Sequence, residues 1–378
     1  MGKDLQAEHG VVCRLAGERL GYFGWPTVAR LADGTLWVAS SGLRAEHVCP
    51  YGKTVVHHSH DDGVTWSPSR VIQDSMIDDR DAGIVDLGGG RLLVSWFRSD
   101  TRPYADASWL PAEERARWQE VIRAWTDAEV DALMGSWVML SQDRGGTWSA
   151  PLRVPVSAPH GPIVRRDGSL LYLGKPFGTW QEMNDAAIAA AGSQDGGRTW
   201  QVLGAVPAAP RTSGPNYHEP HVVELPSGRL LGVIRIEDHS GCSLADAGLI
   251  NFSMMQTESD DGGITWSVPR ALGYPGSPPH LLRHSTGVLV LTYGYRGPTG
   301  GDHDPQDRRF GQRVALSYDD GASWTHDWVI RGDGPDGDLG YPSTVELADG
   351  RLFTVYYQKA AAGEKCSLLW SRWSLPCP

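Results

Sequence analysis

The sequence has few cysteines, few charged residues and no long apolar run. Its 378 residues include five cysteines, at positions 13, 49, 242, 366 and 377, with no paired spacing. This odd, scattered set argues against a disulfide framework or a zinc site and favours free thiols in a reducing compartment. Only 21% of the residues are charged, and no apolar segment is long enough to span a bilayer, so we expect no membrane partner.

Positive charge and targeting features are also scarce. The formal net charge is −11 and there is no basic tract, so we expect no nucleic-acid partner. The first residues, MGKDLQAEHGVV, lack the basic and apolar regions of a secretory signal peptide. We therefore expect a cytoplasmic location.

Turn-forming residues and tryptophan are abundant instead. The chain has 46 Gly, 25 Pro and 16 Trp, which argues against a helix bundle, a coiled coil or a disordered chain. The motif Ser-x-Asp-x-Gly-x-Thr/Ser-Trp is typical of a hairpin turn, in which Asp accepts hydrogen bonds from turn amides and Gly takes a positive φ. Its five copies are Ser59–Trp66, Ser141–Trp148, Ser193–Trp200, Ser259–Trp266 and Ser317–Trp324.

A second repeat predicts the fold. It consists of an apolar run, a turn glycine and another apolar, β-prone run, and its glycines are Gly34, Gly90, Gly168, Gly228, Gly287 and Gly350. Six inner hairpins at intervals near sixty residues predict an all-β, six-bladed β-propeller that forms one domain over residues 1–378. We expect the C-terminal segment KCSLLWSRWSLP and the N-terminal segment GVVCRLAGERL to share the closing blade. A short helical insertion is expected at about 104–135, centred on Pro111–Met134, where apolar residues recur at helical spacing.

The turn glycines also indicate where a site would lie. The innermost strand of each blade starts at the mouth of the central opening, so a residue nine positions before each glycine should lie there. Three of these positions carry groups capable of acid–base or nucleophilic chemistry, namely Asp81, Glu219 and Tyr341. The other three are Trp25, Pro159 and Pro278. We expect Asp81, Glu219 and Tyr341 to share one pocket.

These repeats make the chain resemble the sialidase superfamily of six-bladed propellers. HEPHVVELPSGRLLGVIR is similar to the sialidase pattern of a glutamate followed sixteen residues later by a substrate-binding arginine, here Glu219 and Arg235. Tyr341 in GYPSTVELADGRL matches the family's nucleophilic tyrosine. Arg309, eight residues before the last motif serine, matches a further substrate-binding arginine, and Asp81 in RDAGIVDL resembles an aspartate that lines the pocket.

The resemblance implies a retaining exo-glycosidase that acts on a terminal sialic or related acidic sugar. Tyr341 would be the nucleophile and Glu219 its base, because a neutral tyrosine is not repelled by the substrate's own carboxylate. Arg235 and Arg309 would anchor the sugar. The substrate is then an oligosaccharide or glycoside, and neither a cofactor nor a metal is expected.

The chain departs from the family at two linked positions. The first arginine of the sialidase pattern is replaced in YFGWPTVARL by Gly24 or Trp25, and the glutamate that would hold it is replaced in VYYQ by Tyr357 and Gln358. Losing both partners avoids a buried, unpaired carboxylate. Trp25 becomes a candidate platform for a sugar ring in the space left by the arginine.

Several further assignments stay open at this stage. The acid that protonates the leaving group is expected in LRAEHVCPYGK, with Glu46 preferred and His47 second, and Asp81 stays open as a third candidate. Three histidines lie near the starts of inner strands, namely His218, His221 and His280. We expect them either to bind sugar hydroxyls or to pack against loops. The remaining arginines considered are Arg44, assigned to substrate binding, and Arg98 and Arg296, which either add positive charge to the site or form surface ion pairs.

Two other functions compete with the acidic-sugar hypothesis. With one arginine missing, the substrate could be a neutral sugar of the arabinan or rhamnoside type, cleaved by a carboxylate pair of Glu219 and Asp81. Alternatively, the chain could be a non-catalytic glycan-binding propeller. Sugar identity, linkage, stereochemical course and oligomeric state do not follow from the sequence.

Overall fold

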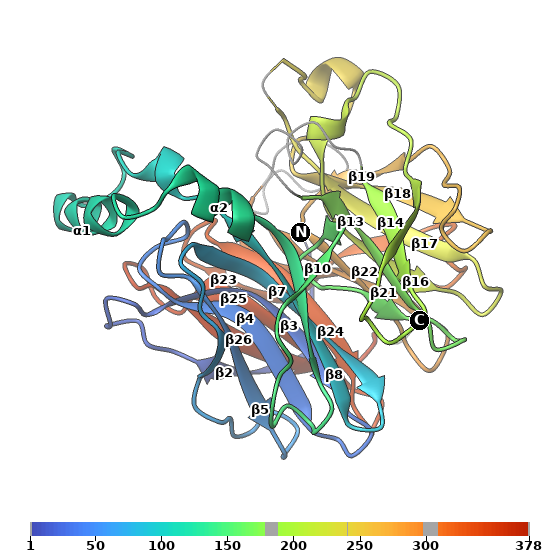
Figure 1. The fold of residues 1–378 in the computed structure, drawn as a ribbon. Coiled ribbons are helices and arrows are strands. Elements are labelled where there is room, and N and C mark those ends of the chain that lie inside the picture. Colours follow the sequence, from blue (N-terminus) through green and yellow to red (C-terminus); the bar gives the residue numbers. More distant parts are fainter. Residues whose placement is uncertain (1, 178–187, 240, 298–308, 377–378) are drawn as a thin grey trace.

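Six antiparallel sheets surround a common axis in the computed structural model of the protein (Figure 1), which describes residues 2–177, 188–239, 241–297 and 309–376. The fold is therefore the six-bladed β-propeller predicted from the repeats. Blade one contains β3 (Tyr22–Arg30), β4 (Leu36–Arg44), β5 (Lys53–Ser59) and β6 (Arg70–Gln73). Blade two contains β7 (Asp78–Gly88), β8 (Arg91–Ser99), β9 (Gly135–Ser141) and β10 (Leu152–Val154). Blade three contains β11 (Val156–Ser157), β12 (Ile163–Val164), β13 (Leu170–Pro176), β14 (Ala189–Ser193) and β15 (Gln201–Ala205).

The other three blades follow the same up-and-down order. Blade four contains β16 (Tyr217–Glu224), β17 (Leu230–Ile236), β18 (Ser253–Ser259) and β19 (Arg270–Pro275). Blade five contains β20 (Pro279–Arg283), β21 (Leu289–Tyr295), β22 (Phe310–Ser317) and β23 (Thr325–Gly334), with β1 (Lys3–Asp4) added in parallel at its outer edge. Blade six contains β24 (Leu339–Glu346), β25 (Leu352–Lys359) and β26 (Cys366–Trp373).

The N-terminal strand closes the ring. The outer strand of blade six is β2 (Ala7–Cys13), which pairs antiparallel with β26 in a register that sets Ala7 opposite Trp373. The two ends of the chain are thus joined in one sheet, as the sequence predicted. This pairing supplies the fourth strand of blade six and closes the ring.

The turns follow the two repeats. All six inner-hairpin glycines have positive φ, between 78° at Gly90 and 95° at Gly287. In the first copy of the other repeat, the Asp61 carboxylate accepts the Thr65 amide at 2.8 Å, and the Trp66 indole N–H donates to the Gly63 carbonyl at 3.0 Å. These contacts tie the turn at the end of the third strand and direct the tryptophan back onto the blade.

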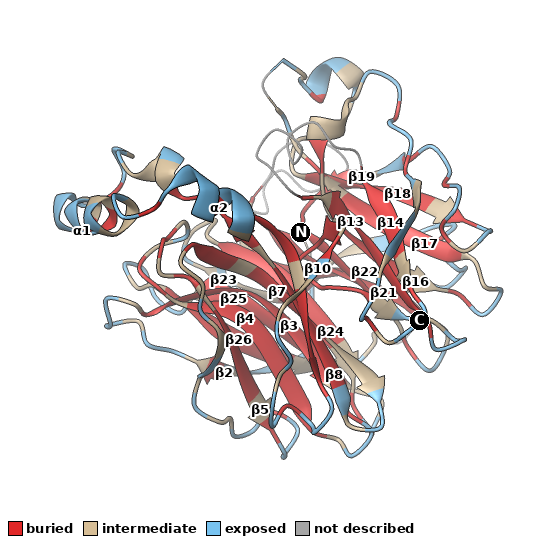
Figure 2. Ribbon diagram, in the orientation of Figure 1, coloured by how far each residue is buried: buried red, intermediate tan, exposed pale blue. Residues whose placement is uncertain are grey.

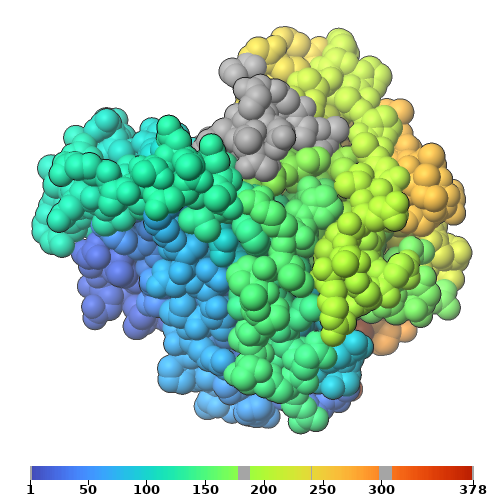
Figure 3. Space-filling view, in the orientation of Figure 1, coloured from blue at the N-terminus to red at the C-terminus, as the bar shows by residue number. Residues whose placement is uncertain are grey.

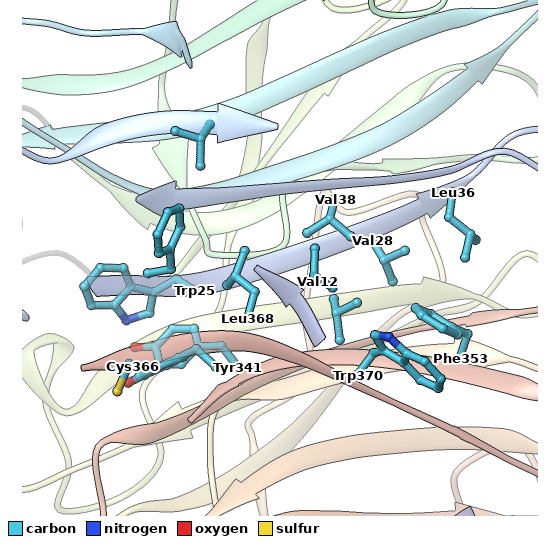
Figure 4. Close-up of a cluster of buried hydrophobic side chains, with 14 of the residues drawn as sticks. Val12, Trp25, Val28, Leu36, Val38, Tyr341, Phe353, Cys366, Leu368 and Trp370 are labelled. Carbon is cyan, nitrogen blue, oxygen red and sulfur yellow. The ribbon is translucent and has the colours of Figure 1, made fainter. Parts of the chain in front are cut away.

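Most of each strand is buried (Figure 2), and apolar side chains pack between neighbouring blades. The cluster between blades one and six contains Val28, Val38, Phe353 and Trp370 at one end. At the other end, nearer the mouth, it contains Trp25, and Figure 4 shows this indole close to the Tyr341 ring. The core between these blades thus extends up to the candidate site.

The insertion after β8 contains two helices, α1 (Ala112–Ile122) and α2 (Asp127–Leu133), inside the predicted range. The Thr126 hydroxyl accepts the Glu129 amide, which caps α2. Trp118 of α1 packs with Cys49 of the loop after β4, and Val130 of α2 packs in a cluster with Phe177. The helices therefore pack on the loop after β4 and beside the end of β13, and they project from the ring (Figure 3).

Two sequence expectations concern other features of the chain. Within the ranges given above, no helix is long and apolar enough to cross a membrane. Cys13, Cys49, Cys242 and Cys366 are free thiols, and Cys377 lies outside the described residues.

Candidate active site

Four of the six mouth positions share an unusual backbone conformation. Trp25, Asp81 and Tyr341 each have a φ of 53°, and Glu219 has a φ of 45°. In all four inner strands the ladder to the second strand skips residues at this point. A bulge of this kind bends the strand and re-aims a side chain. A large L-residue at positive φ is strained, so the surrounding structure must hold it there.

Tyr341 and Glu219 meet at the mouth from blades six and four. The Tyr341 hydroxyl donates a hydrogen bond to Glu219 Oε1. Arg235, on the second strand of blade four, donates from Nη1 to Glu219 Oε2 at 2.5 Å and to Tyr341 Oη at 3.2 Å. The three side chains therefore form one hydrogen-bonded group, in which the carboxylate contacts both other members.

The electrostatics of this group separate the roles of the phenol and the carboxylate. Burial and then the charge of Glu219 raise the pKa of Tyr341 well above its usual value. Burial also opposes ionisation of Glu219, but Arg235 and the Tyr341 hydrogen bond outweigh it and lower the pKa of this carboxyl. At neutral pH the phenol is thus a neutral donor and Glu219 is a carboxylate able to accept its proton.

Glu237 holds the other end of Arg235. Arg235 Nη2 donates to Glu237 Oε2 at 2.5 Å, and Glu237 Oε1 lies 3.3 Å from His218 Nε2. Burial and, to a smaller extent, the charge of Lys175 lower the pKa of His218 to about 4, so the imidazole is neutral at neutral pH. Glu237 was not predicted from the sequence. The available signal was its position two residues after Arg235, on the same face of the strand.

A cavity of about 240 Å³ lies beside this group, over blades two to four. Glu219, Asp81 and His218 line it together with residues of the insertion after β8, of blades two and three, and of the loop after β4 in blade one. Those further residues are Val48, Arg80, Phe97, Ser99, Tyr104, Ser157, Ala158, Pro159, Lys175 and Phe177.

Asp81 is the buried acid of this cavity. It is 4% exposed, and its Oδ1 has no hydrogen-bond partner among the described residues. Burial raises the pKa of Asp81 to about 7; Arg80 opposes this shift and Glu219 adds to it. The carboxyl is therefore partly protonated at neutral pH and can donate a proton.

Arg309 is not part of this arrangement. Its guanidinium contacts Asp4 Oδ1 at 2.5 Å and the Gly2 carbonyl at 3.2 Å, next to β1 on the outer edge of blade five. The expectation that Arg309 lies beside Arg235 is therefore corrected. Counting back from the motif serine gives a sequence position but not the direction of the side chain. Arg309 precedes β22, and its side chain contacts the N-terminal segment.

Trp25 and Arg44 are structural. Trp25 is 1% exposed and packs against Tyr357 and Tyr341, with ring centroids 5.8 Å and 6.3 Å away. The indole fills the space expected for a sugar, so Trp25 is not an exposed platform. The fully buried Arg44 makes a two-pronged ion pair with Asp78 at 2.5 and 2.7 Å. Arg44 does not line the cavity, which corrects its assignment to substrate binding.

Neither loop candidate for the acid is in the cavity wall. Glu46 lies 3.5 Å from Lys365 Nζ of the neighbouring blade six and not in the cavity wall. This corrects its placement at the cavity. The His47 ring is 48% exposed, and its Nδ1 lies 2.9 Å from the Tyr22 hydroxyl and 3.1 Å from Asp338 Oδ1. Of the three acids considered, Asp81 is the one that lines the cavity.

The histidines divide into two groups. His218 lines the cavity, whereas the stacked rings of His221 and His280 lie 4.4 Å apart inside the ring of blades, with His160 against both. His221 Nδ1 accepts the Leu281 amide at 2.9 Å, and burial lowers the pKa of His221 to about 3. His221 and His280 thus connect neighbouring inner strands and do not line the cavity, which corrects their assignment to sugar binding.

The remaining candidates are explained by local contacts. Arg98 Nε donates to Asp79 Oδ1 at 3.1 Å and is buried, and Arg296 donates to three backbone carbonyls, among them Leu339 at 2.6 Å. Among the residues with described positions, no group of three or more His, Cys, Asp or Glu side chains could hold a metal ion.

Solved structures with the same fold include proteins of several activities. A Dyadobacter fermentans protein of unknown function is 22% identical, with 98% of each chain covered and a TM-score of 0.74. The intramolecular trans-sialidase from Ruminococcus gnavus, in complex with oseltamivir carboxylate, is 15% identical over 97% of each chain, with a TM-score of 0.64. A Penicillium chrysogenum α-L-arabinanase complexed with arabinobiose is 14% identical over 97% of this chain and 98% of its own, with a TM-score of 0.59.

Sequence comparison identifies the family directly. No curated protein matches the chain at a significant level. The family model described as BNR repeat-like domain matches residues 98–354, from the end of β8 in blade two to β25 in blade six, which is more than half of the sequence. The repeats, the six blades and this match agree, and the chain belongs to the BNR repeat-like domain family.

Proposed function

We propose that the protein is a retaining glycoside hydrolase that removes a terminal acidic sugar, with Tyr341 as nucleophile. The observation that carries this proposal is the contact of the Tyr341 hydroxyl with Glu219 beside a cavity that also contains Asp81. Propellers of the same fold include an enzyme described as a trans-sialidase, which supports the reaction class by analogy of fold.

The proposed reaction proceeds in two displacements. Tyr341 Oη attacks the anomeric carbon while Glu219 takes the phenolic proton, and Asp81 gives its proton to the departing glycosidic oxygen. The bond to the leaving group breaks, and a glycosyl–tyrosine intermediate remains. Water then attacks the same carbon, Asp81 accepts the proton of that water, and the phenol recovers its proton from Glu219, so the sugar is released with its original anomeric configuration.

Arg235 positions this pair. It donates to both Glu219 and Tyr341, so it keeps the carboxylate ionised and supports the negative charge that develops on the phenolic oxygen. The second end of Arg235 is held by Glu237, which restricts the guanidinium to one orientation.

A panel of aryl glycosides tests the proposal. The panel covers N-acetylneuraminic acid, uronic acids, arabinofuranose and rhamnose, with release of the aryl alcohol as the readout. The wild-type protein should cleave at least one acidic member with retention. Tyr341→Phe should lose about 1,000-fold in kcat, whereas the matched variant Tyr357→Phe, which removes a neighbouring buried phenol, should keep activity within about threefold.

A second candidate function has one observation in its favour. Among the described residues that line the cavity, the carboxyl groups are those of Asp81 and Glu219, whereas Tyr341 is not a lining residue. A neutral sugar could be cleaved by this carboxylate pair, and a solved propeller of this fold is described as an arabinanase. In that case Asp81→Asn would abolish cleavage of a neutral aryl glycoside, and Tyr341→Phe would be tolerated.

A further inference from the structure

The cavity lies on one side of the proposed nucleophile. Its described lining residues include Asp81 and Glu219 but not Tyr341, which contacts Glu219 from blade six. In a retaining displacement the nucleophile and the departing oxygen flank the anomeric carbon from opposite sides. Asp81 is the proposed proton donor to that oxygen and lies inside the cavity. The leaving group therefore departs into the cavity, and the cavity wall indicates its chemistry.

Four apolar side chains line the cavity from four different segments. They are called the apolar wall here and comprise Val48 after β4, Phe97 on β8, Tyr104 in the insertion after β8 and Phe177 after β13. The ring centroids of Phe97 and Phe177 lie 4.7 Å apart, and the ring planes are inclined by 44°. Two inclined rings form a corner and not a flat stacking platform, so a group that enters it meets apolar atoms on more than one side.

The apolar wall begins beside the proposed acid. Phe97 lies directly opposite Arg80 in the pairing of β7 with β8, and Arg80 immediately precedes Asp81. The Arg80 guanidinium lies 5.8 Å from the Phe97 ring centroid, and its Nε lies 3.9 Å from Asp81 Oδ1. A leaving group whose oxygen is beside Asp81 therefore brings its next atoms within reach of the Phe97 ring.

The size of the cavity suits one ring. Its volume is about 240 Å³, whereas an apolar cavity of about 150 Å³ is enough to bind benzene. A substituted phenyl ring or a short alkyl chain would remove the apolar wall from water, which is favourable in proportion to the area covered. A sugar there would turn hydroxyl groups towards Phe97 and Phe177, whose rings have neither a donor nor an acceptor for a conventional hydrogen bond.

We propose that the apolar wall binds an aromatic or aliphatic leaving group, so that the preferred substrates are aryl or alkyl glycosides. This inference rests on the proposed glycosidase function and names the leaving group, which that function does not specify. Asp81 gives its proton to the glycosidic oxygen as the bond to the anomeric carbon breaks. The alcohol or phenol then departs as a neutral molecule in contact with Phe97, Tyr104 and Phe177.

Binding of a free leaving group tests the site without turnover. The probe is 4-methylumbelliferone at pH 6, and its fluorescence anisotropy reports binding. The wild-type protein should bind it saturably, with a Kd unchanged between 20 and 500 mM NaCl, because salt screens charges and not apolar contacts. Tyr104→Ala should raise this Kd about fivefold or more, whereas Tyr104→Phe should stay within about twofold of the wild type.

A set of glycosides tests where the site lies relative to the sugar. The protein carries Tyr341→Phe so that no reaction interferes. The ligands are the phenyl, methyl and galactosyl glycosides of the acidic sugar that the aryl glycoside panel identifies. Calorimetry should show that the phenyl glycoside binds about tenfold more tightly than the other two.

Variants connect this preference to the apolar wall. Tyr104→Ala and Phe97→Ala should each remove most of the advantage of the phenyl glycoside, and the affinity for the methyl glycoside should stay within about twofold. The matched control is Trp109→Ala in the same insertion, where Trp109 is 53% exposed and is not a lining residue among those described. This control should keep the full preference. Circular dichroism checks folding, and the result for the partly exposed Tyr104 decides the question if Phe97→Ala does not fold.

The outcomes separate this inference from the proposed function. Equal binding of the phenyl and methyl glycosides, tighter binding of the galactosyl glycoside, or a preference unchanged in both wall variants would overturn the inference and leave a glycosidase. Absence of saturable 4-methylumbelliferone binding would also overturn it. Binding of this probe that depends on Tyr104, in a protein that cleaves no glycoside, would support the apolar site and reject the hydrolase.

Discussion

The Tyr341 hydroxyl donates a hydrogen bond to Glu219, a residue 122 positions earlier in the chain. The two side chains come from blades six and four, so this contact forms only when the ring is closed. Each lies at a bulge with positive φ, and neither backbone conformation is favourable for such a residue. Strained positions of this kind are concentrated at functional sites, which is why the predictions below centre on them.

Replacement of Glu219 should remove the base and preserve the shape of the site. In Glu219→Gln the amide can still contact Tyr341 and Arg235, but it cannot take the phenolic proton. We expect kcat to fall by about 100- to 1,000-fold, the usual range for a lost general base. The control is Glu224→Gln, at the far end of the same strand, where Glu224 accepts the Arg166 amide at 2.7 Å. Comparable losses in both variants would contradict this role.

The activity should depend on pH through Asp81. The pKa of this carboxyl is raised to about 7, and a general acid must be protonated, so kcat/KM should decrease as the pH rises above about 7. In Asp81→Asn the residual activity on an aryl glycoside with a good leaving group should lose this alkaline decrease. Rate measurements from pH 5 to 9 test this, and an unchanged alkaline limb in Asp81→Asn would assign it to another group.

The same residue should lower the stability of the folded protein at alkaline pH. The folded-state pKa of Asp81 is about 7, above the unfolded value near 3.9. Between these two pH values the folded state therefore binds more protons than the unfolded state. The contribution is favourable below pH 4 and is lost as the pH rises through about 7. Asp81→Asn should therefore raise the free energy of unfolding at pH 8 by about 1–3 kcal/mol. Urea unfolding at pH 8 measures this, and a destabilised variant would contradict it.

The buried pair of Arg44 and Asp78 should be important for stability. Both side chains are 0% exposed, so removing one partner leaves a charge without compensation. Asp78→Ala should lower the free energy of unfolding by about 3–5 kcal/mol. The exposed pair of Lys53 and Asp74 provides the comparison, and Asp74→Ala should cost less than about 1 kcal/mol. Similar losses in the two variants would show that burial of the pair is not decisive.

The sequence was sufficient for the fold because the repeats encode turns. Each inner-hairpin glycine takes the positive φ that a tight turn requires, and six of them at regular intervals define six blades. The same glycines locate the starts of the inner strands, which is why counting back nine residues found Asp81, Glu219 and Tyr341. Positions on a regular strand can be predicted by counting.

The wrong predictions concern residues whose side-chain direction cannot be obtained by counting along the sequence. Arg309 and Glu46 lie outside the strands, and the paths of their loops depend on contacts with distant segments, Asp4 for one and Lys365 for the other. Trp25 was found at the right depth, but its burial depends on the packing of Tyr357 from another blade.

The most direct test of the account is to trap the proposed intermediate. A fluorinated glycosyl fluoride of the best acidic substrate from the aryl glycoside panel should slow breakdown of the glycosyl–enzyme. Mass spectrometry of the intact protein and its peptides then locates the sugar. If Tyr341 is the nucleophile, we expect one added sugar on Tyr341, no adduct in the Tyr341→Phe variant, and slower labelling of the Glu219→Gln variant. An adduct on Asp81 or Glu219, or full labelling of Tyr341→Phe, would contradict it.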